Sequence, residues 1–300
     1  MGINLKSFIS AFVTDKKGSF GTRQRAAVTW RALNEFTEKK HWKNITPETI
    51  TSKQIRAYIE HRIAEGISAR SIQNEASHIR RACSGAGRDI GNVKDQKNNW
   101  SSARLGVPEG SRIGGKRAID TEKLQKALEQ VPNDVKAALG LSQALGLRRQ
   151  EAVMAGGSLA YWVQLLDGAK AQGRGAFLPV GHGTKGGRPR FVTVPVQRLD
   201  LVMQAVCSAQ ALATLQGGCI INANGLKEAL KRVSNACRRA GLQGEDSAHG
   251  IRRLFAQTQF TYYLNEGIDT RTALAMLSND LGHGDGRGRW VWNNYLSGDQ

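Results

Sequence analysis

Acidic residues are scarce in this sequence. Its 300 residues include 25 Asp and Glu but 43 Lys and Arg, which gives a formal net charge of +18 at pH 7. No carboxylates form a cluster of the kind that metal-dependent nucleases and transposases need to hold their ions. The composition therefore disfavours that chemistry, and the excess of positive charge predicts a polyanionic partner such as nucleic acid.

Cysteine pairs, long apolar runs and targeting segments are also lacking. The cysteines are widely spaced without a CxxC pair, and the six histidines do not combine with them at metal-ligand spacings. The sequence contains no signal peptide and no apolar run near about 18 residues. We therefore expect free thiols in a reducing cytoplasm, no metal site and no membrane attachment. The four cysteines are Cys83, Cys207, Cys219 and Cys237.

The length of 300 residues favours two domains over one, since a single core usually stops growing below that size. Residues 1–83 are expected to form the first domain, a bundle of helices. Apolar residues recur at helical spacing over residues 20–38, and a capping box, Thr51 with Gln54, begins another helix. A third helix is expected to begin near Ser68.

Periodicity is lost over residues 84–116, which collect Gly, Asn, Ser and Lys, so we expect a linker there. Such a basic connector would suit a protein that wraps a duplex, but it is equally typical of a solvated loop between domains. Residues 117–300 form the predicted second domain, with short strands at residues 177–180 and 191–196. The predicted fold is thus mainly α with a small β-sheet. Helices of the second domain are expected at residues 121–131, 135–155, 226–240, 249–264 and 270–278.

Two basic residues of the second domain have contexts that suit phosphate chemistry. Arg148 is predicted to lie late in the helix over residues 135–155, where Glu151 on the same face could hold its guanidinium toward a phosphate. In isolation, the same pair is more typical of a simple intrahelical salt bridge. Lys185 follows Gly183 in a glycine-rich hairpin tip, from which a lysine can reach DNA and protonate a leaving oxygen. Basic hairpin tips also commonly bind only backbone phosphates, or nothing.

The end of the chain adds two histidines, an arginine and a tyrosine. His249 and Arg252 are three residues apart on a predicted helix, so both can contact one phosphate. His283 lies at a glycine turn, and Tyr295 follows twelve residues later. Each could instead be structural, the histidines as hydrogen-bonding groups and Tyr295 as an aromatic that packs beside Trp290. The rival nucleophiles on sequence alone are Tyr58, Tyr161, Tyr262 and Tyr263.

The order of these residues resembles the tyrosine recombinases, also called the phage integrase family. The matching motifs are Gly146-Leu147-Arg148-x-x-Glu151, Gly183-Thr184-Lys185, His249-Gly250-Ile251-Arg252, Leu281-Gly282-His283 and Tyr295-Leu296. Each motif is short, but five in order are specific, and together they cover the whole second domain. The runs from Gly183 to Arg190 and from Leu281 to Arg289 look most similar to integrases of bacterial mobile elements. The helical first domain resembles the family's core-binding domain, and the second its α+β catalytic domain.

The resemblance implies a nucleophile and a phosphate-binding pair. Tyr295 would attack the scissile phosphodiester, which leaves a 3′-phosphotyrosine and a free 5′-hydroxyl. Arg148 and Arg252 would bind the non-bridging oxygens and stabilise the charge that develops in the transition state. Glu151 would support Arg148 in this task.

Three further residues would complete the implied catalytic set. His283 would add a hydrogen bond to the same phosphate, Lys185 would protonate the leaving 5′-oxygen, and His249 would assist proton transfer at the tyrosine. Strand exchange would then reverse the chemistry, so the bond energy is conserved. The resemblance therefore implies neither a cofactor nor a metal.

The resemblance also implies partners and a place of action. The main partner would be a double-stranded DNA recombination site, bound by a homotetramer on paired sites whose subunits associate weakly without DNA. Accessory DNA-bending proteins could take part. The reaction would integrate or excise a mobile element at the nucleoid in the bacterial cytoplasm. DNA contacts are expected from Arg70, Arg80, Arg81, Lys97, Arg188 and Arg190.

Two other functions would keep part of this pattern. A type IB topoisomerase uses a similar set of residues but relaxes supercoils without exchanging strands, and the compact two-domain size favours a recombinase over it. A DNA-binding protein without catalysis would explain the charge and the helical bundle. It would not explain five motifs in order.

Overall fold

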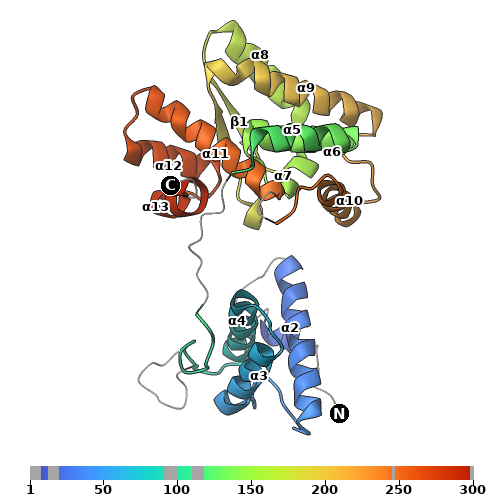
Figure 1. Cartoon of the computed structure of the whole chain (residues 1–300), viewed down its shortest axis with the longest axis vertical. Helices are drawn as coiled ribbons and strands as arrows, with labels where there is room; N and C mark the ends of the chain where they lie inside the picture. The colour runs from blue at the N-terminus through green and yellow to red at the C-terminus, as the bar shows by residue number, and fades with distance from the viewer. Residues whose placement is uncertain (1–7, 13–19, 91–99, 110–117, 245–246, 298–300) are drawn as a thin grey trace. The chain divides into compact units, whose positions relative to one another are not determined.

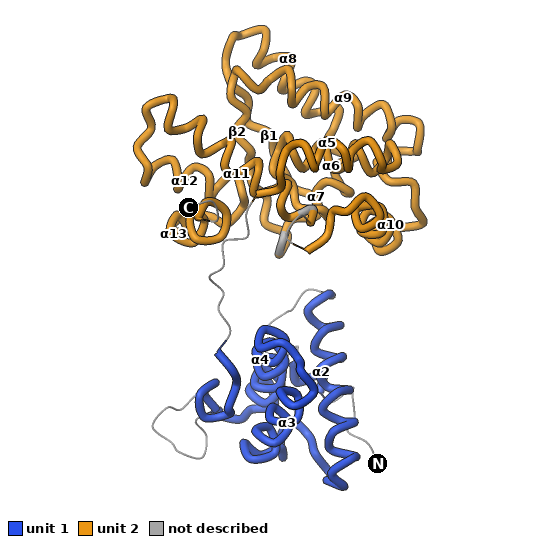
Figure 2. Tube along the Cα trace, viewed as in Figure 1, with its two compact units in different colours: residues 1–112 blue, residues 113–300 orange. Residues whose placement is uncertain are grey.

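The structure of the chain is a computed structural model, and it divides into two compact units, residues 1–112 and 113–300 (Figure 2). Both units are mainly helical, and the second contains a two-stranded antiparallel sheet. This confirms the predicted fold class. The described residues are 8–12, 20–90, 100–109, 118–244 and 247–297, without the side chains of Phe20, Lys185 and Ala248.

Three long helices form the first unit: α2 (Phe20–Lys39), α3 (Ser52–Ala64) and α4 (Ala69–Gly85) (Figure 1). The predicted capping box is present at the start of α3. The Thr51 hydroxyl accepts the Gln54 N–H at 3.3 Å, and the Gln54 side chain accepts the Thr51 N–H at 2.8 Å. These two bonds satisfy amides that the first turn of a helix leaves without partners.

The predicted linker, residues 84–116, differs from the structure over its described part. Trp100 and Leu105 are buried in the core of the first unit. The Arg88 guanidinium lies over the Trp100 ring, 4.5 Å from its centroid. Residues 100–109 therefore belong to the first unit. The tryptophan explains the difference, because burying so large an apolar side chain stabilises the segment despite its Gly-, Asn- and Ser-rich composition.

Helices surround one apolar core in the second unit. They are α5 (Thr121–Gln130), α6 (Asn133–Leu145), α7 (Arg149–Val153), α8 (Leu159–Ala171), α9 (Leu199–Leu215), α10 (Leu226–Arg239), α11 (Ala248–Asn265), α12 (Thr270–Asp280) and α13 (Gly288–Val291). α6 packs against α9 and α11, and α12 packs against α11 and α13 (Figure 1). The sequence did not predict α8 or α9. None of the described helices in either unit combines the length and the apolarity needed to cross a bilayer.

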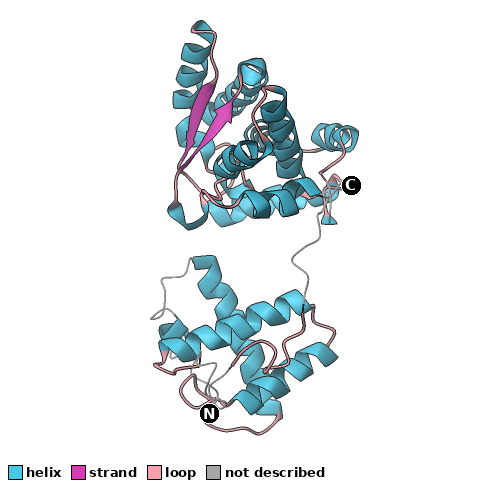
Figure 3. Ribbon diagram, turned by 90° about the vertical axis from the view of Figure 1, so that its left-hand side faces the viewer, coloured by secondary structure: helices cyan, strands magenta, loops and turns pink. Residues whose placement is uncertain are grey.

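The sheet is a hairpin of β1 (Ala176–Val180) and β2 (Arg190–Val194), which confirms both predicted strands (Figure 3). Its side chains alternate, so that Leu178 and Val192 are buried while Phe177 and Phe191 are exposed. The segment between the strands is the hairpin tip, residues 181–189. It includes a short helical turn, η2 (Lys185–Gly187).

The helix predicted over residues 135–155 is wrong, because it is two helices separated by a turn. α6 ends at Leu145, and Gly146 takes a left-handed conformation with φ of 59°. A Cβ at Gly146 would collide with the Phe255 ring, so only glycine fits the position. Arg148 therefore lies just before the first turn of α7 and not late in a long helix.

Replacing Gly146 with alanine should test this turn. We expect Gly146→Ala to lower the free energy of unfolding by about 2–4 kcal/mol, through left-handed strain and the collision with Phe255. Gly140→Ala is the matched control, since Gly140 lies inside α6 with open space at its Cβ position. This control should stabilise the chain by about 0.5–1 kcal/mol. Urea denaturation measures both, and equal effects of the two substitutions would contradict the assigned turn.

Candidate active site

Four of the predicted catalytic residues meet in the second unit, although they come from separate elements. Arg148 precedes α7, Arg252 lies in α11, His283 follows α12, and Tyr295 lies in a single π-helical turn, η5 (Trp292–Leu296). Arg252 Nε donates to the Tyr295 hydroxyl at 3.3 Å, and His283 Nε2 lies 3.2 Å from the same oxygen. A cation and an imidazole thus hold one tyrosine oxygen.

Two backbone carbonyls hold the arginines side by side. The Leu281 carbonyl accepts hydrogen bonds from Arg148 Nη2, at 3.1 Å, and from Arg252 Nη2. The Gly146 carbonyl accepts a hydrogen bond from Arg252 Nη1. These carbonyls follow the last turns of α12 and α6, where helices leave acceptors without an intrahelical partner and where the helix dipole favours cations. The ends of two helices therefore position both guanidinium groups.

The carboxylate of Glu151 lies among three guanidinium groups. It accepts hydrogen bonds from Arg148 Nη1 at 2.7 Å and from Arg190 Nη2 at 2.8 Å, and Arg252 Nη1 lies 3.8 Å away. It also accepts the backbone N–H of Arg148 at 2.7 Å, which closes the first turn of α7. Burial alone would raise the pKa of Glu151, but these arginines and the backbone N–H lower it to about 2. The carboxylate is therefore ionised at neutral pH.

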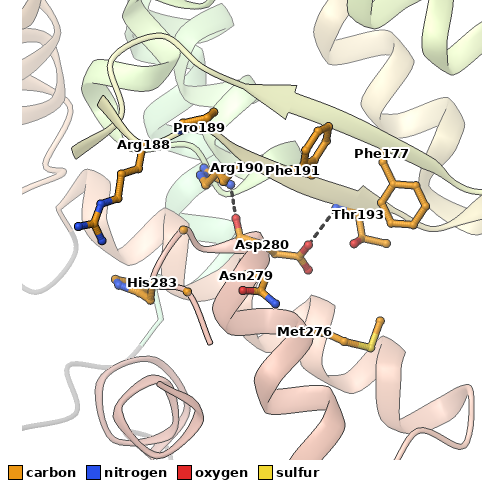
Figure 4. Close-up of a pocket in the computed structure, with 12 residues that line it drawn as sticks. Phe177, Arg188, Pro189, Arg190, Phe191, Thr193, Met276, Asn279, Asp280 and His283 are labelled. Atoms are coloured by element: carbon orange, nitrogen blue, oxygen red, sulfur yellow. Dashed lines mark hydrogen bonds between the residues drawn. The ribbon is translucent and has the colours of Figure 1, made fainter. Parts of the chain in front are cut away.

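Arg190, predicted to contact DNA, is buried and only 7% exposed. Its guanidinium binds Glu151 and donates to the Asp280 carbonyl (Figure 4). The strand geometry explains the difference, because β2 begins at Arg190 and turns this side chain toward the core, while Arg188 in the tip stays exposed. Burial lowers the pKa of Arg190, and the charge of Glu151 opposes this effect.

Tyr295 lies in an aromatic pocket and is only 4% exposed. Its ring centroid is 5.7 Å from those of His249 and His283 and 5.9 Å from that of Trp290. The Arg252 guanidinium carbon lies 5.9 Å from the same ring centroid. Single π-helical turns are frequent at functional sites. The tyrosine is thus bordered by two imidazoles and a guanidinium.

The other tyrosines lack this environment. Tyr263 is also buried, but its hydroxyl donates to the Asp280 carboxylate at 2.5 Å. Burial and this carboxylate raise the pKa of Tyr263, which makes its phenolate harder to form. Tyr262 is half-buried beside Tyr263, with their ring centroids 5.8 Å apart. Tyr161 is 53% exposed on α8, and Tyr58 belongs to the first unit. Geometry therefore favours Tyr295 among the tyrosines.

A cavity of about 460 Å³ opens beside Arg148 and Arg252. His249 lines it from the first turn of α11, with an exposed side chain. Arg149 and Arg238 also line it, and no carboxylate occurs among its described lining residues. Sequence reasoning did not single out these last two arginines. Arg149 could have been found as the neighbour of Arg148, whereas Arg238 lies in a helix with no motif to mark it.

Lys185 lies in the hairpin tip, as the sequence predicted, within the turn η2. The placement of its side chain lies outside the described part of the structure. The backbone of the tip approaches α7 closely at one point. Gly183 has φ of 72°, and a Cβ there would lie 2.7 Å from the Gln150 carbonyl oxygen. The tip therefore packs directly against the start of α7, which follows Arg148.

The remaining residues predicted to contact DNA lie in different settings. Arg70 and Arg188 are exposed. Arg80 donates to a backbone carbonyl at 3.1 Å, and the Arg81 guanidinium lies 4.2 Å from the centroid of a phenylalanine ring. Both of these arginines thus have partners inside the first unit. Lys97 lies outside the described residues.

Comparison with known families places both units in one class of enzyme. A profile described as "Integrase" matches residues 106–258, about half of the chain, and one described as "Phage integrase, N-terminal" matches residues 4–91. Fold and site thus define an integrase with a separate N-terminal domain. The chain belongs to the phage integrase, or tyrosine recombinase, family. The first match includes the predicted site residues from Arg148 to Arg252, and the last two lie beyond its end.

Solved structures share the fold at low sequence identity. A lambda integrase dimer bound to a COC′ core site has a TM-score of 0.59 and 20% identity, over 99% of this chain and 78% of that chain. The Tn1549 transposon integrase in complex with transposon right end DNA has a TM-score of 0.55 and 13% identity, over 97% and 94%. XerH site-specific recombinase bound to palindromic difH substrate has a TM-score of 0.52 and 15% identity, over 89% and 75%. No curated protein sequence matches the chain.

The charge of Glu151 should stabilise the fold. We expect Glu151→Gln to lower the free energy of unfolding by about 3 kcal/mol at neutral pH, since a carboxylate with a pKa of about 2 when folded and about 4.3 when unfolded contributes that amount. The contribution is present above about pH 5 and is lost as the pH falls toward about 2. The difference in the free energy of unfolding between wild type and variant should therefore become smaller in acid.

Urea denaturation across this pH range measures the gap. Glu129→Gln is the matched control, because Glu129 is exposed on α5 and should contribute little. A gap for Glu151→Gln that stays constant from neutral pH into acid would contradict the assigned ion pairs.

Proposed function

We propose that this integrase is a site-specific recombinase that cleaves and rejoins DNA strands through a 3′-phosphotyrosine intermediate at Tyr295. One observation carries the proposal: the Tyr295 hydroxyl lies within hydrogen-bond distance of His283 and of Arg252, and Arg252 itself lines a cavity together with other arginines. A hydroxyl in that setting can act as a nucleophile on a bound phosphate, because the neighbouring cations stabilise both the phenolate and the phosphate.

Arg148 and Arg252 are arranged to bind the scissile phosphate. Each guanidinium has five N–H groups. Within the described residues, protein acceptors take two of those of Arg148 and three of those of Arg252. Both side chains therefore keep donors for the non-bridging oxygens. Because the protein already holds the guanidinium groups, their charge is in place before the transition state forms.

The chemical step transfers the phosphoryl group from DNA to protein. The Tyr295 oxygen attacks phosphorus, the bond to the 5′-oxygen breaks, and Lys185 gives that oxygen a proton. The 3′ end of the strand is then joined to Tyr295, and a 5′-hydroxyl is free. Attack of a 5′-hydroxyl from a second strand reverses the step, so the bond energy is conserved.

The two histidines take different parts in this step. In the free protein His283 is the imidazole at hydrogen-bond distance from the Tyr295 hydroxyl, while His249 lies in the phosphate cavity with its ring centroid 5.7 Å from that of Tyr295. A bound phosphate offers His283 a non-bridging oxygen. We assign the proton of Tyr295 to His249 in the bound state, because hydrogen bonds of a catalytic site often tighten only with substrate.

The likeness to DNA-bound integrases supports a proposed assembly. Lambda integrase has been solved as a dimer on a core site and as a tetramer on a Holliday junction. We infer that this chain also acts as a tetramer on paired sites, with its first unit on the DNA. Integration or excision of a mobile element is the use proposed for this activity, with the net charge of +18 favouring the encounter with DNA.

A nicked duplex tests the reaction. The substrate is enriched from a randomised pool by binding to the full chain and then nicked at successive positions near its centre. Cleavage beside a nick releases a short fragment with the 5′-hydroxyl, which traps the protein on the DNA. We expect a covalent adduct on a denaturing gel, formed in EDTA.

Tyr295→Phe should abolish this adduct and leave DNA affinity within about threefold, because it removes only the attacking oxygen. Tyr161→Phe is the matched control, since Tyr161 is exposed on α8, and its adduct should equal that of the wild type. An adduct that still forms with Tyr295→Phe would show that Tyr295 is not the nucleophile. The absence of an adduct on every duplex of the panel would favour a DNA-binding protein without catalysis. Relaxation of supercoiled DNA without exchange between two sites would favour a topoisomerase.

A further inference from the structure

Arg190 lies at the centre of the site, but the proposed reaction gives it no role. Its guanidinium donates to the Glu151 carboxylate at 2.8 Å and to the Asp280 carbonyl. The same carboxylate holds Arg148 at 2.7 Å. Arg190 therefore shares one carboxylate with Arg148, which we propose binds the phosphate, and a second hydrogen bond joins Arg190 to the end of α12.

Arg190 also marks the base of the hairpin tip. It begins β2 and pairs with Val180, the last residue of β1. The tip that carries Lys185, residues 181–189, leaves the sheet at this pair. A salt bridge from this position anchors both ends of the tip, because the two strands are hydrogen-bonded to each other there.

Two glycines allow the hairpin to approach the rest of the site closely. A Cβ at Gly183 would lie 2.7 Å from the Gln150 carbonyl oxygen, and a Cβ at Gly282 would collide with the Arg190 side chain. Both glycines have positive φ, of 72° and 64°, which other residues rarely adopt. The tip thus meets the first turn of α7, and Arg190 meets the turn after α12.

The face of the hairpin toward α12 depends on polar bonds more than on packing. Asp280 accepts the Thr193 N–H at 2.9 Å, and its carbonyl accepts the bond from Arg190 (Figure 4). Beside these bonds lies a cavity of about 520 Å³, lined by Phe177 and Phe191 among others. Apolar contacts therefore do not fill this face, and on it hydrogen bonds to Asp280 hold the strand.

We propose that Arg190 is a positioning residue for protonation of the leaving group: it fixes the hairpin that carries Lys185 to the Glu151 carboxylate beneath the phosphate-binding arginines. The inference rests on the proposed role of Lys185 as the general acid. In that step the Tyr295 oxygen forms a bond to phosphorus, the bond from phosphorus to the 5′-oxygen breaks, and the proton of Lys185 Nζ moves to that oxygen. Without Arg190 the tip would lose its link to Glu151, and Lys185 would spend less time at the leaving oxygen.

A sulfur substitution separates this role from phosphate binding. The probe is the enriched nicked duplex with its scissile 5′-oxygen replaced by sulfur, compared with the ordinary duplex. A thiol has a pKa of about 8.5, far below that of an alcohol, so a thiolate leaves without a proton from the enzyme. A variant that has lost only leaving-group protonation should form the adduct at nearly the wild-type rate on the sulfur substrate. A variant that has lost phosphate binding should stay slow on it.

We expect Arg190→Met to slow adduct formation about 100-fold on the oxygen substrate, the lower range of what a general acid contributes, and to come within about fivefold of wild type on the sulfur substrate. Lys185→Ala should behave in the same way. Glu151→Gln should be slow on both substrates, because it releases Arg148. Arg174→Met, an exposed arginine before β1, is the matched control and should equal the wild type on both.

Arg190→Lys is the second variant, in case the methionine variant folds poorly. Lysine keeps the charge beside Glu151 but lacks the planar fork that reaches the Asp280 carbonyl as well. Arg190→Lys should slow adduct formation less than Arg190→Met on the oxygen substrate, and it should not slow it on the sulfur substrate. If the sulfur substrate restores the rate of adduct formation for Lys185→Ala but for neither Arg190 variant, the inference about Arg190 is wrong, and Lys185 remains the proposed general acid. If Lys185→Ala itself fails to recover, the proposed general acid is wrong, and the inference falls with it.

Discussion

One buried carboxylate, that of Glu151, allows this fold to gather positive charge before any DNA is bound. It accepts hydrogen bonds from Arg148 and Arg190 and lies 3.8 Å from a nitrogen of Arg252. Arg190 and Arg252 are buried, and guanidinium groups buried so close together without a partner of opposite charge would each cost several kcal/mol. Glu151 offsets part of this repulsion but leaves an excess of positive charge, and a phosphate would complete the balance. The site therefore favours the ligand that the proposed reaction requires.

The geometry of the arginines comes from where helices end. Gly146 and Leu281, whose carbonyls hold Arg252, follow α6 and α12, and a glycine with positive φ forms each turn, Gly146 itself and Gly282. A carbonyl at a helix end is a free acceptor at the negative end of the dipole. The glycine motifs of the sequence thus have a physical purpose, which is to end a helix where its last acceptors can hold a cation. Tyr295 then reaches Arg252 from a separate short helix.

Much of this was predictable from the sequence, because caps, apolar periodicity and turn residues are local signals. The capping box at Thr51 and the hairpin strands follow from such signals. The break at Gly146 was not predictable in this way, because an isolated glycine is also tolerated inside helices. The Phe255 ring, which excludes other residues at this position, is far away in the sequence. The burial of Arg190 also depends on distant partners, Glu151 and Asp280. The convergence of the predicted catalytic residues could be inferred only from the family resemblance, because spacing along the sequence does not determine distances in space.

The most direct test of the account identifies the residue that carries the DNA. Adduct trapped on the nicked duplex is digested with a nuclease and then with trypsin, and the peptides are analysed by mass spectrometry. Cleavage after Arg289 releases residues 290–300, which contain Tyr295 and no other tyrosine. We expect the nucleotide mass on this peptide, attached through the phenolic oxygen. A nucleotide on the peptide that contains Tyr262 and Tyr263, or on any residue other than Tyr295, would contradict the account.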